Sequence, residues 1–357
     1  MLVLGFESSC DETACAVVKY EGGTLSVLAD VVASQVDIHR LYGGVVPEIA
    51  GRAHIEAISR ITYEALKRAG VTLSQIDCVA VTTHPGLIGA LLVAVNFAKS
   101  LAVANHIPLV EVDHMRAHIA TAYLLGENSP TPPYISAALS GGHTSIYEVT
   151  GYNEFTLIGS TRDDAIGEAF DKIGRVIGIP YPAGAGFDKL ARQGFQEATG
   201  LEDDFWAAYS KTEAYRDPAM RLPSPALAGD TLDFSFSGLK TAAINLLHHY
   251  EQKGETLNTA LFAARYTYEA VEAVANKLDR ALSQHPGWDL VVSGGVAANS
   301  HLRARLKTLC DAHGVSLYLP PKQLCGDNGA MVAAQGVYEF LAGNRATAAL
   351  NARATDD

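Results

Sequence analysis

VLGFESSCDETACAVV, residues 3–18, contains two apolar segments separated by a polar one. Val3–Glu7 predicts a short apolar strand, Ser8–Thr13 a polar turn, and Ala14–Val18 a second strand. Together they predict a β-hairpin whose tip is acidic and rich in hydroxyl groups.

The same layout returns in the middle of the chain. Tyr134–Leu139 predicts a strand, Ser140–Thr144 a turn, and Ser145–Val149 a return strand. Two halves that each open with strand, polar turn and strand indicate an internal duplication. We therefore expect an α/β fold with two related lobes around a cleft, which is the default place for a ligand.

Each hairpin leads into alternating helices and strands. Apolar periodicity with Gly or Pro stops predicts helices over 47–69, 87–104, 261–282 and 327–341, and strands over 76–82, 289–293 and 315–319. The expected organisation is an N-terminal lobe of residues 1–132 completed by a C-terminal helix of residues 327–342, a second lobe of residues 133–326, and a flexible tail of residues 343–357.

The composition is that of a folded, acidic protein. With 48% hydrophobic and 18% charged residues, the 357-residue chain can build large cores. Its net charge of −12 argues against a broad basic surface for nucleic acid, but leaves room for a local patch or a partner protein. Five cysteines without zinc-ribbon spacing are typical of reduced thiols in a cytoplasmic protein.

No segment is expected to direct the chain into a membrane. The N-terminus reaches Glu7 without a basic region, so we do not expect a signal peptide. The most apolar stretch, residues 87–104, contains Asn96 and Lys99. It is better explained as a buried core helix than as a membrane span.

Two histidines follow Asp113 at the start of a predicted helix. His114 and His118 are four residues apart, so they share a helix face and could bind one divalent metal. They would supply two of the usual three protein ligands of an open catalytic site. The same spacing also fits two satisfied polar side chains. A zinc protease is disfavoured, because Met115 stands where that motif needs Glu as general base.

Glycine-rich turns after two predicted strands suit a phosphate group. Ser140–His143 and Ser293–Gly295 offer outward-pointing N–H groups and lack Cβ atoms that would block an anion. Their corresponding places in a duplicated fold favour nucleotide binding. No Gly-Lys-Ser/Thr sequence of the Walker type is present, so the chain is not a P-loop protein.

Other candidates have both a functional and a structural interpretation. Gly184 could lie against a base or ribose and Asp188 could accept from sugar hydroxyls, or their loop could be a tight connection. Asp171 shares a helical stripe with Gly167, and we expect it to point inward. Asp327 is either the N-cap of the last helix or the third ligand of a His-His-Asp site, and spacing leaves both open.

Taken together, these segments resemble the tRNA N6-adenosine threonylcarbamoyltransferase family, which belongs to the actin-like ATPase superfamily. The matches cover nearly the whole chain, and each is modest alone. They are Gly5–Thr13, Tyr42–Glu48, Pro85–Leu87, Asp113–His118, Ser140–Thr144, Gly167–Lys172, Phe234–Lys240, Gly294–Asn299 and Asp327–Met331.

The resemblance implies a set of site residues. One divalent metal per subunit, iron or alternatively zinc, would be bound by His114, His118 and Asp327. The adenylate phosphate would be lined by Ala138, Leu139, Ser140, Gly141 and Gly142. The nucleoside would be held by Asp171, Gly184, Asp188 and Asn299.

The resemblance also implies a reaction. A threonylcarbamoyl group would pass from threonylcarbamoyl-adenylate to N6 of the adenosine on the 3′ side of the anticodon, in tRNAs that read codons beginning with A, with release of AMP. The donor is already activated, so catalysis would rest on positioning and charge stabilisation rather than on a nucleophilic side chain. His143 is a candidate proton carrier or a structural hydrogen-bonding residue.

The implied partners are tRNA and the proteins TsaB and TsaE, without a membrane. Local cations available for tRNA are Arg116, Lys172, Arg175, Arg216, Arg221 and Lys240. Two positions depart from the family pattern: His84 replaces a common Gly, and Gly326 a common Thr.

Three other functions remain open at this point. An O-carbamoyltransferase usually has a longer chain, and a kinase would not need the histidine pair. An actin-like scaffold resembling TsaB is disfavoured, because all three candidate ligands are present.

Overall fold

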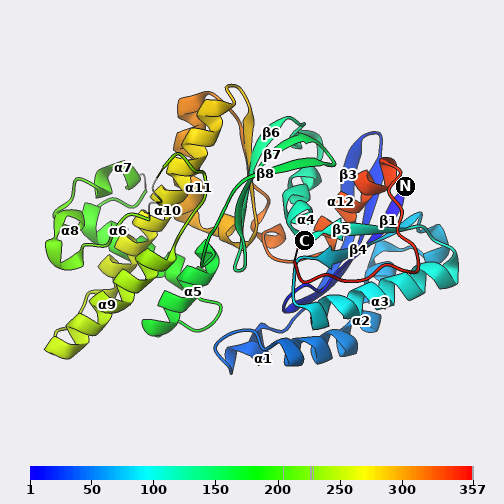
Figure 1. Ribbon diagram of the computed structural model, residues 1–357, viewed down its shortest axis with the longest axis horizontal. Helices are drawn as coiled ribbons and strands as arrows, with labels where there is room; N and C mark the ends of the chain where they lie inside the picture. The colour runs from blue at the N-terminus through cyan, green and yellow to red at the C-terminus, as the bar shows by residue number, and fades with distance from the viewer. Residues whose placement is uncertain (204, 226, 228, 356–357) are drawn as a thin grey trace. The chain divides into compact units, whose positions relative to one another are not determined.

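Two five-stranded sheets form the centres of two units (Figure 1). The computed structural model describes residues 1–203, 205–225, 227 and 229–355. The first unit comprises residues 1–132, 149–155 and 318–357, and the second comprises residues 133–148 and 156–317. The predicted lobes also divide after residue 132. They differ in residues 149–155 and 318–326, which the structure places in the first unit.

The two sheets have the same strand order, which confirms the duplicated actin-like α/β fold. The first runs β3-β2-β1-β4-β5 and the second runs β8-β7-β6-β9-β10. In each sheet the central strand pairs in parallel with the next strand in the order given, β1 with β4 and β6 with β9. The strands are β1 Leu2–Glu7, β2 Glu12–Glu21, β3 Thr24–Ser34, β4 Cys78–His84, β5 Leu109–Asp113, β6 Tyr134–Leu139, β7 Thr144–Gly151, β8 Glu154–Ser160, β9 Asp289–Ser293 and β10 Leu317–Tyr318.

Alternation along β1 sends neighbouring side chains to opposite faces of the first sheet. Leu4 and Phe6 pack in a core with Ile58 of α2 (Pro47–Ala69) and Leu91 of α3 (Ile88–Asn105). Gly5, between them, faces α12 (Gly329–Leu341). The first sheet is therefore covered by α2 and α3 on one face and by α12 on the other.

Helix α12 lies unusually close to its sheet because glycines face each other across the contact. A Cβ on Gly5 would lie 2.5 Å from the carbonyl oxygen of Gly329, and a Cβ on Gly336 would lie 2.4 Å from the Cβ of Ala80. No real side chain fits at such distances. The close approach fixes the start of α12, where Asp327 lies, against β1 and β2.

Helix α3 is the one helix in the described part of the chain that is long and apolar enough to cross a membrane. Leu91, Ala94 and Val95 on it belong to the core under the first sheet. This placement agrees with the prediction of a core helix. Two shorter helices complete the first unit, α1 (Val36–Arg40) and α4 (His114–Ala120).

The predicted flexible tail, residues 343–357, instead contacts the first unit along its described length. Ala346 N–H donates to the carbonyl of Leu109 at 2.8 Å, and Arg353 N–H donates to that of Thr83 at 2.9 Å. These backbone groups are hydrogen-bonded to residues of β5 and β4, and the amino-acid composition of the tail does not predict such long-range hydrogen bonds.

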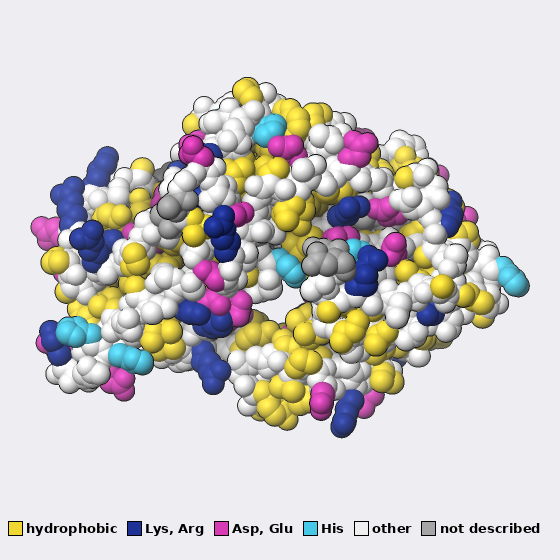
Figure 2. Space-filling model, viewed as in Figure 1, with side chains coloured by type: hydrophobic (Ala, Val, Ile, Leu, Met, Phe, Trp, Pro, Cys, Tyr) yellow, Lys and Arg dark blue, Asp and Glu magenta, His cyan; other side chains and the backbone are white. Residues whose placement is uncertain are grey.

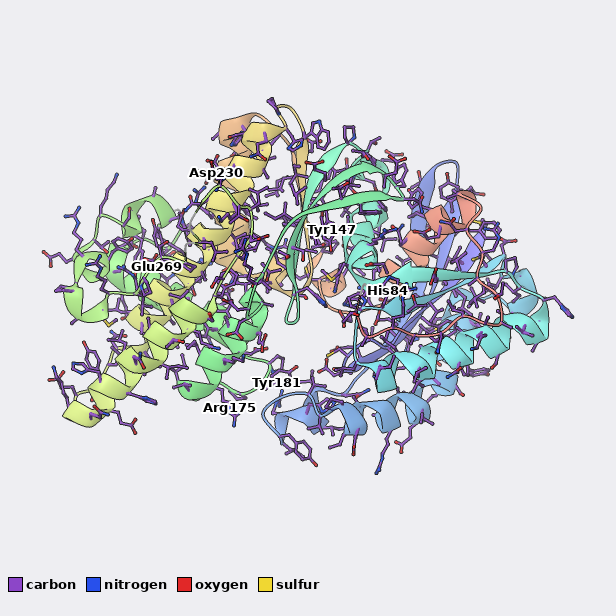
Figure 3. The ribbon with its side chains drawn as sticks, in the orientation of Figure 1. His84, Tyr147, Arg175, Tyr181, Asp230 and Glu269 are labelled. Carbon is purple, nitrogen blue, oxygen red and sulfur yellow. The ribbon has the colours of Figure 1, made fainter. Side chains whose placement is uncertain are left out.

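The helices of the second unit gather around α10 (Thr259–Gln284), which packs closely on α6 (Gly184–Thr199) and α11 (Ser300–His313). Within α10, Arg265 pairs at 3.1 Å with Glu269, which is labelled in Figure 3, and its guanidinium lies over the Tyr215 ring. The other helices are α5 Ile166–Val176, α7 Trp206–Tyr209, α8 Glu213–Arg216 and α9 Ser237–Lys253.

Candidate functional site

The histidine pair lies at the start of α4. Asp113 is the N-cap of this helix, and its Oδ1 accepts from the N–H groups of Met115 at 2.7 Å and Arg116 at 2.9 Å. One helical turn brings the His114 and His118 rings to 4.6 Å between centroids. Both rings are buried.

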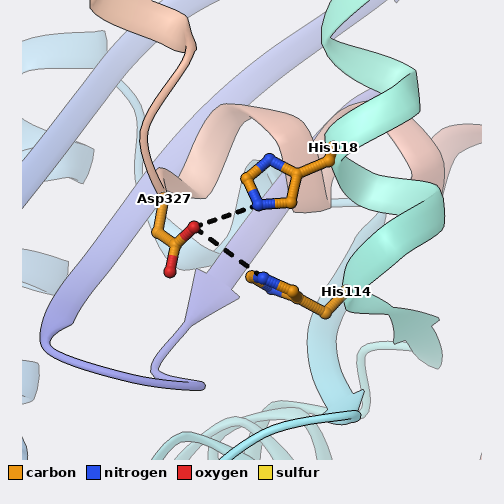
Figure 4. Close-up of side chains that lie close together, drawn as sticks. All are labelled: His114, His118 and Asp327. Carbon is orange, nitrogen blue, oxygen red and sulfur yellow. Dashed lines mark ion pairs between the residues drawn. The ribbon is translucent and has the colours of Figure 1, made fainter. Parts of the chain in front are cut away.

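Asp327 joins the pair from the far end of the chain (Figure 4). Its Oδ1 lies 3.1 Å from Nε2 of His118 and 3.8 Å from Nε2 of His114. The interpretation of Asp327 as a helix N-cap is wrong. Asn328 is the cap, because its Oδ1 accepts from the N–H of Met331 at 2.8 Å.

The donor set fits a divalent metal. One ligand atom from each of His114, His118 and Asp327 lies within 4.8 Å of the others. His118 is 1% exposed, and apart from the contact of its Nε2 with Oδ1 of Asp327 at 3.1 Å, neither ring nitrogen makes an aligned hydrogen bond among the described residues. A buried imidazole left in this way is costly unless a cation takes its lone pair. Two imidazoles and a carboxylate with open positions suit iron(II) or zinc(II).

The electrostatics of the cluster also favour a cation. Burial lowers the pKa of His114, but the carboxylates of Asp327 and Glu7 outweigh it and raise the pKa to about 9. Burial, followed by repulsion from Asp327 and Asp11, raises the pKa of Glu12 to about 9. A cation bound by His114 and Asp327 would relieve the repulsion between Glu12 and its acidic neighbours, and it would displace the proton on His114.

Sequence reasoning gave no role to Glu7, although an acid that closes an apolar strand is a signal of a buried charge. Its Oε2 lies 3.3 Å from Nδ1 of His114, on the side of the ring away from the nitrogen that faces Asp327.

A buried hydrogen-bond chain supports the hairpin tip beside the cluster. The N–H of Val46 donates to Nδ1 of His39 at 3.3 Å, and His39 Nε2 lies 3.1 Å from Oε1 of Gln35. Gln35 Nε2 lies 3.3 Å from Nδ1 of His54, whose Nε2 lies 3.0 Å from the carbonyl of Cys10. Only neutral, Nε2-protonated histidines satisfy every link, and we assign these tautomers on that basis.

The predicted phosphate turn follows β6 in the second unit. Ser140 N–H donates to the carbonyl of His143 at 2.8 Å, and His143 N–H donates to Ser140 Oγ at 3.1 Å, which closes the turn. Gly167 N–H donates to Ser140 at 3.3 Å, so the turn rests on the start of α5. Ala138 and Leu139 end the strand, and a Cβ on Gly294 would collide with Leu139.

The predicted nucleoside residues continue from this turn around the same unit. Asp171 on α5 accepts from the N–H of Ala183 at 2.7 Å, directly before Gly184. Asp188 on α6 accepts from the N–H and Oγ of Ser300, both at 3.0 Å.

Asn299, the last of these residues, is the N-cap of α11. Its Oδ1 accepts from the N–H groups of His301 at 3.0 Å and Leu302 at 2.9 Å. The β6 turn, α5, α6 and α11 therefore form a connected series that includes every predicted substrate residue.

Four glycines in or next to this series have no positive φ, and a Cβ on any of them would meet nothing within 4 Å. They are Gly141, Gly142, Gly184 and Gly295. Neither strain nor packing in the described structure requires glycine there. The open space at these positions would allow a ligand to approach the backbone closely.

Two of the cations offered for tRNA, Lys172 and Lys240, pair with a neighbouring acid. Asp164 lies 2.7 Å from Nζ of Lys172 and also pairs with Lys240, which lowers the pKa of its carboxyl against the effect of burial. On the face shown in Figure 2, Lys and Arg side chains are interspersed with acidic, hydrophobic and other side chains.

The two departures from the family pattern lie next to the metal group. Nε2 of His84, which is labelled in Figure 3, lies 3.6 Å from the carboxylate of Asp113, the cap of α4. Its Nδ1 lies 2.9 Å from Nη2 of Arg353. The carbonyl of Gly326 accepts from the side chain of Asn328 at 2.8 Å. Each departure therefore contacts a helix cap and no proposed ligand in these hydrogen bonds.

Comparison with solved structures supports the fold. HypF in its phosphate- and nucleotide-bound form has a TM-score of 0.56 at 16% identity, over 94% of this chain and 46% of HypF. HypF from T. kodakarensis has a TM-score of 0.55 at 14% identity, over 96% of this chain and 48% of that one. The chain thus spans about half the length of either HypF protein.

Sequence relatives cover the chain almost completely. A family model described as "TsaD: tRNA N6-adenosine threonylcarbamoyltransferase" matches residues 26–334. Curated proteins of that name are 44% identical in Geobacillus thermodenitrificans, over 98% of this chain and 95% of the relative, and 45% identical in Anaeromyxobacter sp. strain Fw109-5, over 99% and 98%. The chain belongs to the tRNA N6-adenosine threonylcarbamoyltransferase family.

Proposed function

We propose that the protein transfers the threonylcarbamoyl group of threonylcarbamoyl-adenylate to N6 of the adenosine on the 3′ side of the anticodon, in tRNAs that read codons beginning with A. The observation that carries the proposal is the buried group of His114, His118 and Asp327 in a chain of this family. It also distinguishes this function from a kinase or a scaffold, neither of which needs such a group.

The reaction balances without a covalent enzyme intermediate. The adenosine N6 attacks the carbamoyl carbon, a C–N bond forms, and the bond from that carbon to the phosphate oxygen breaks. AMP leaves with the electron pair, and N6 loses a proton. We assign that proton to His143, whose backbone is fixed by the Ser140 turn.

The residues of the first unit would hold the metal. His114 and His118 offer Nε2 atoms from one helix face, and Asp327 adds a carboxylate. A bound iron(II) or zinc(II) ion would supply Lewis-acid stabilisation of negative charge that develops during the transfer. We propose iron as the native metal, with zinc as the alternative.

The residues of the second unit would bind the adenylate part of the donor. The turn formed by Ala138, Leu139, Ser140, Gly141 and Gly142 would line the phosphate through backbone N–H groups. Asp171, Gly184, Asp188 and Asn299 would line the nucleoside. Although Asp171 and Asp188 accept from backbone N–H groups, each carboxylate oxygen has two lone pairs and can also accept from a ribose hydroxyl.

Each predicted lobe would then bind one component: residues 1–132 and 327–342 would bind the metal, and residues 133–326 would bind the adenylate. We further propose that the protein acts in the cytoplasm, away from membranes, with TsaB and TsaE as partners. A partner surface would help to bind tRNA, because the chain has a net charge of −12 and its Lys172 and Lys240 are paired.

Reconstitution tests the function. Synthetic threonylcarbamoyl-adenylate carrying a labelled threonyl group is incubated with unmodified tRNA, the protein, TsaB and TsaE. Mass spectrometry of the digested tRNA should show the modified nucleoside only for tRNAs that read codons beginning with A. Label on other tRNAs at the same rate, or no label on any, would contradict the proposal.

A further inference from the structure

A fully buried carboxylate lies behind the histidine pair and has no part in the mechanism above. Glu7 ends β1 in the interior of the first sheet and is 0% exposed. A charge removed from water in this way is costly unless donors surround it. The placement therefore calls for a function or for a set of strong hydrogen bonds.

Glu7 is held by donors on both oxygens. Its Oε1 accepts from the N–H of Ser9 at 2.5 Å, and its Oε2 accepts from Oγ1 of Thr82 at 2.5 Å. The hydrogen bond from Thr82 comes from the neighbouring parallel strand β4. These two bonds fix the plane of the carboxylate, and both favour its ionised form.

The remaining partner of this carboxylate is His114. Nδ1 of the imidazole lies 3.3 Å from Oε2 of Glu7 and 3.2 Å from Oγ of Ser9. Because the carboxylate can only accept, Nδ1 carries the hydrogen, and we assign the tautomer on that ground. When the ring is neutral, its lone pair then lies on Nε2, the nitrogen that faces Asp327 at 3.8 Å.

We propose that Glu7 is a positioning residue of the metal group, which holds His114 in the tautomer and ring orientation that present Nε2 to a divalent cation. The inference rests on the metal site of the proposed function. Its physical basis is general: a carboxylate behind a metal-bound imidazole fixes the ring and makes the ligating nitrogen more basic.

The substitution Glu7→Gln shows why the charge matters. Glutamine keeps the shape, and its single oxygen can still accept from Ser9 N–H. Its amide N–H₂ then meets His114, so the favoured tautomer reverses and the proton moves to Nε2. Nε2 then binds a metal ion only in the less favoured tautomer, without a carboxylate to hold the hydrogen on Nδ1.

Binding of Co²⁺ to the metal-free full chain tests the proposal without measuring transfer activity. Cobalt gives a visible absorption that reports on its ligands, and a competing chelator sets the dissociation constant. Glu7→Gln should weaken Co²⁺ binding roughly 10- to 100-fold. The matched control is Glu339→Gln, which alters a buried glutamate of the same unit that accepts from Gln335 and contacts no histidine in its hydrogen bonds. It should bind Co²⁺ like the wild type.

The outcomes separate the two proposals. If the wild type binds one Co²⁺ and folded Glu7→Gln binds it within about twofold as tightly, the role of Glu7 is overturned while the metal site stands. If the wild type binds no Co²⁺, the metal site itself is overturned, and the role of Glu7 with it. Should Glu7→Gln fail to fold, Thr82→Val removes one donor to the carboxylate. An unchanged Co²⁺ affinity in that variant also overturns the proposal, whereas a several-fold loss supports it.

Discussion

The contact between α12 and the first sheet makes a sharp prediction for Gly5→Ala. The added Cβ would lie 2.5 Å from the N atom of Ala333 and 2.5 Å from the carbonyl oxygen of Gly329. Both are backbone atoms of α12, so no rotamer change relieves the collision. Ordinary contacts need about 3.5 Å, so the helix must move by about 1 Å.

The cost follows from that displacement. Overpacking of a closely packed core typically costs about 1–3 kcal/mol. Helix α12 should therefore open more readily, and amide exchange in residues 329–341 should accelerate about 5- to 150-fold where exchange follows local opening. Because Asp327 precedes this helix by two residues, metal binding should weaken as well.

Hydrogen–deuterium exchange with peptide-level mass spectrometry is the assay. The control is Gly51→Ala on α2, where a Cβ would lie 3.6 Å from the carbonyl oxygen of Gly89, an ordinary contact. This control should be neutral or stabilising by up to about 1 kcal/mol, because alanine favours a helix interior. Equal exchange of residues 329–341 in Gly5→Ala and Gly51→Ala would refute the packing argument.

Three further predictions concern the surroundings of the site. Burial raises the pKa of Asp30 to about 6, although hydrogen bonds from the backbone oppose this shift. Ionisation of Asp30 therefore destabilises the folded protein as the pH rises from about 4 to 6. Asp30→Asn should raise the free energy of unfolding in urea by about 1–2 kcal/mol at pH 8 and leave it unchanged at pH 3.5. Gln35→Leu breaks the buried hydrogen-bond chain at its centre and should cost about 1–3 kcal/mol in urea unfolding. Gly142→Val fills open space without backbone strain and should weaken binding of a fluorescent AMP analogue at least about tenfold with the unfolding midpoint unchanged.

The hairpins, core helices and duplication could be predicted because their apolar periodicity is local. The helix predicted over 47–69 is α2, Pro47–Ala69, with Gly70 in the left-handed conformation at its end. The third strand of each hairpin was missed. β3 and β8 are half exposed, and their apolar residues do not alternate regularly enough to stand out.

The site could be predicted in its members but less well in its supports. The spacing of His114 and His118 is a local signal, whereas the choice between two roles for Asp327 depended on which residue caps α12. The roles of Glu7 and Asp164 were missed because the residues they pair with, His114 and Lys240, lie far away in the sequence. Long-range pairing of this kind leaves no periodic pattern in a single chain.

The most direct test of the account compares Asp327→Ala with the wild type in the reconstituted tRNA reaction, with the metal content of each protein measured in the same preparation. Asp311→Ala, which alters an exposed acid paired with Lys307, is the control. We predict that Asp327→Ala loses its metal and modifies tRNA at least about 100-fold more slowly, because metal assistance is worth several kcal/mol. Loss of the metal with tRNA modification at the wild-type rate would contradict the central claim.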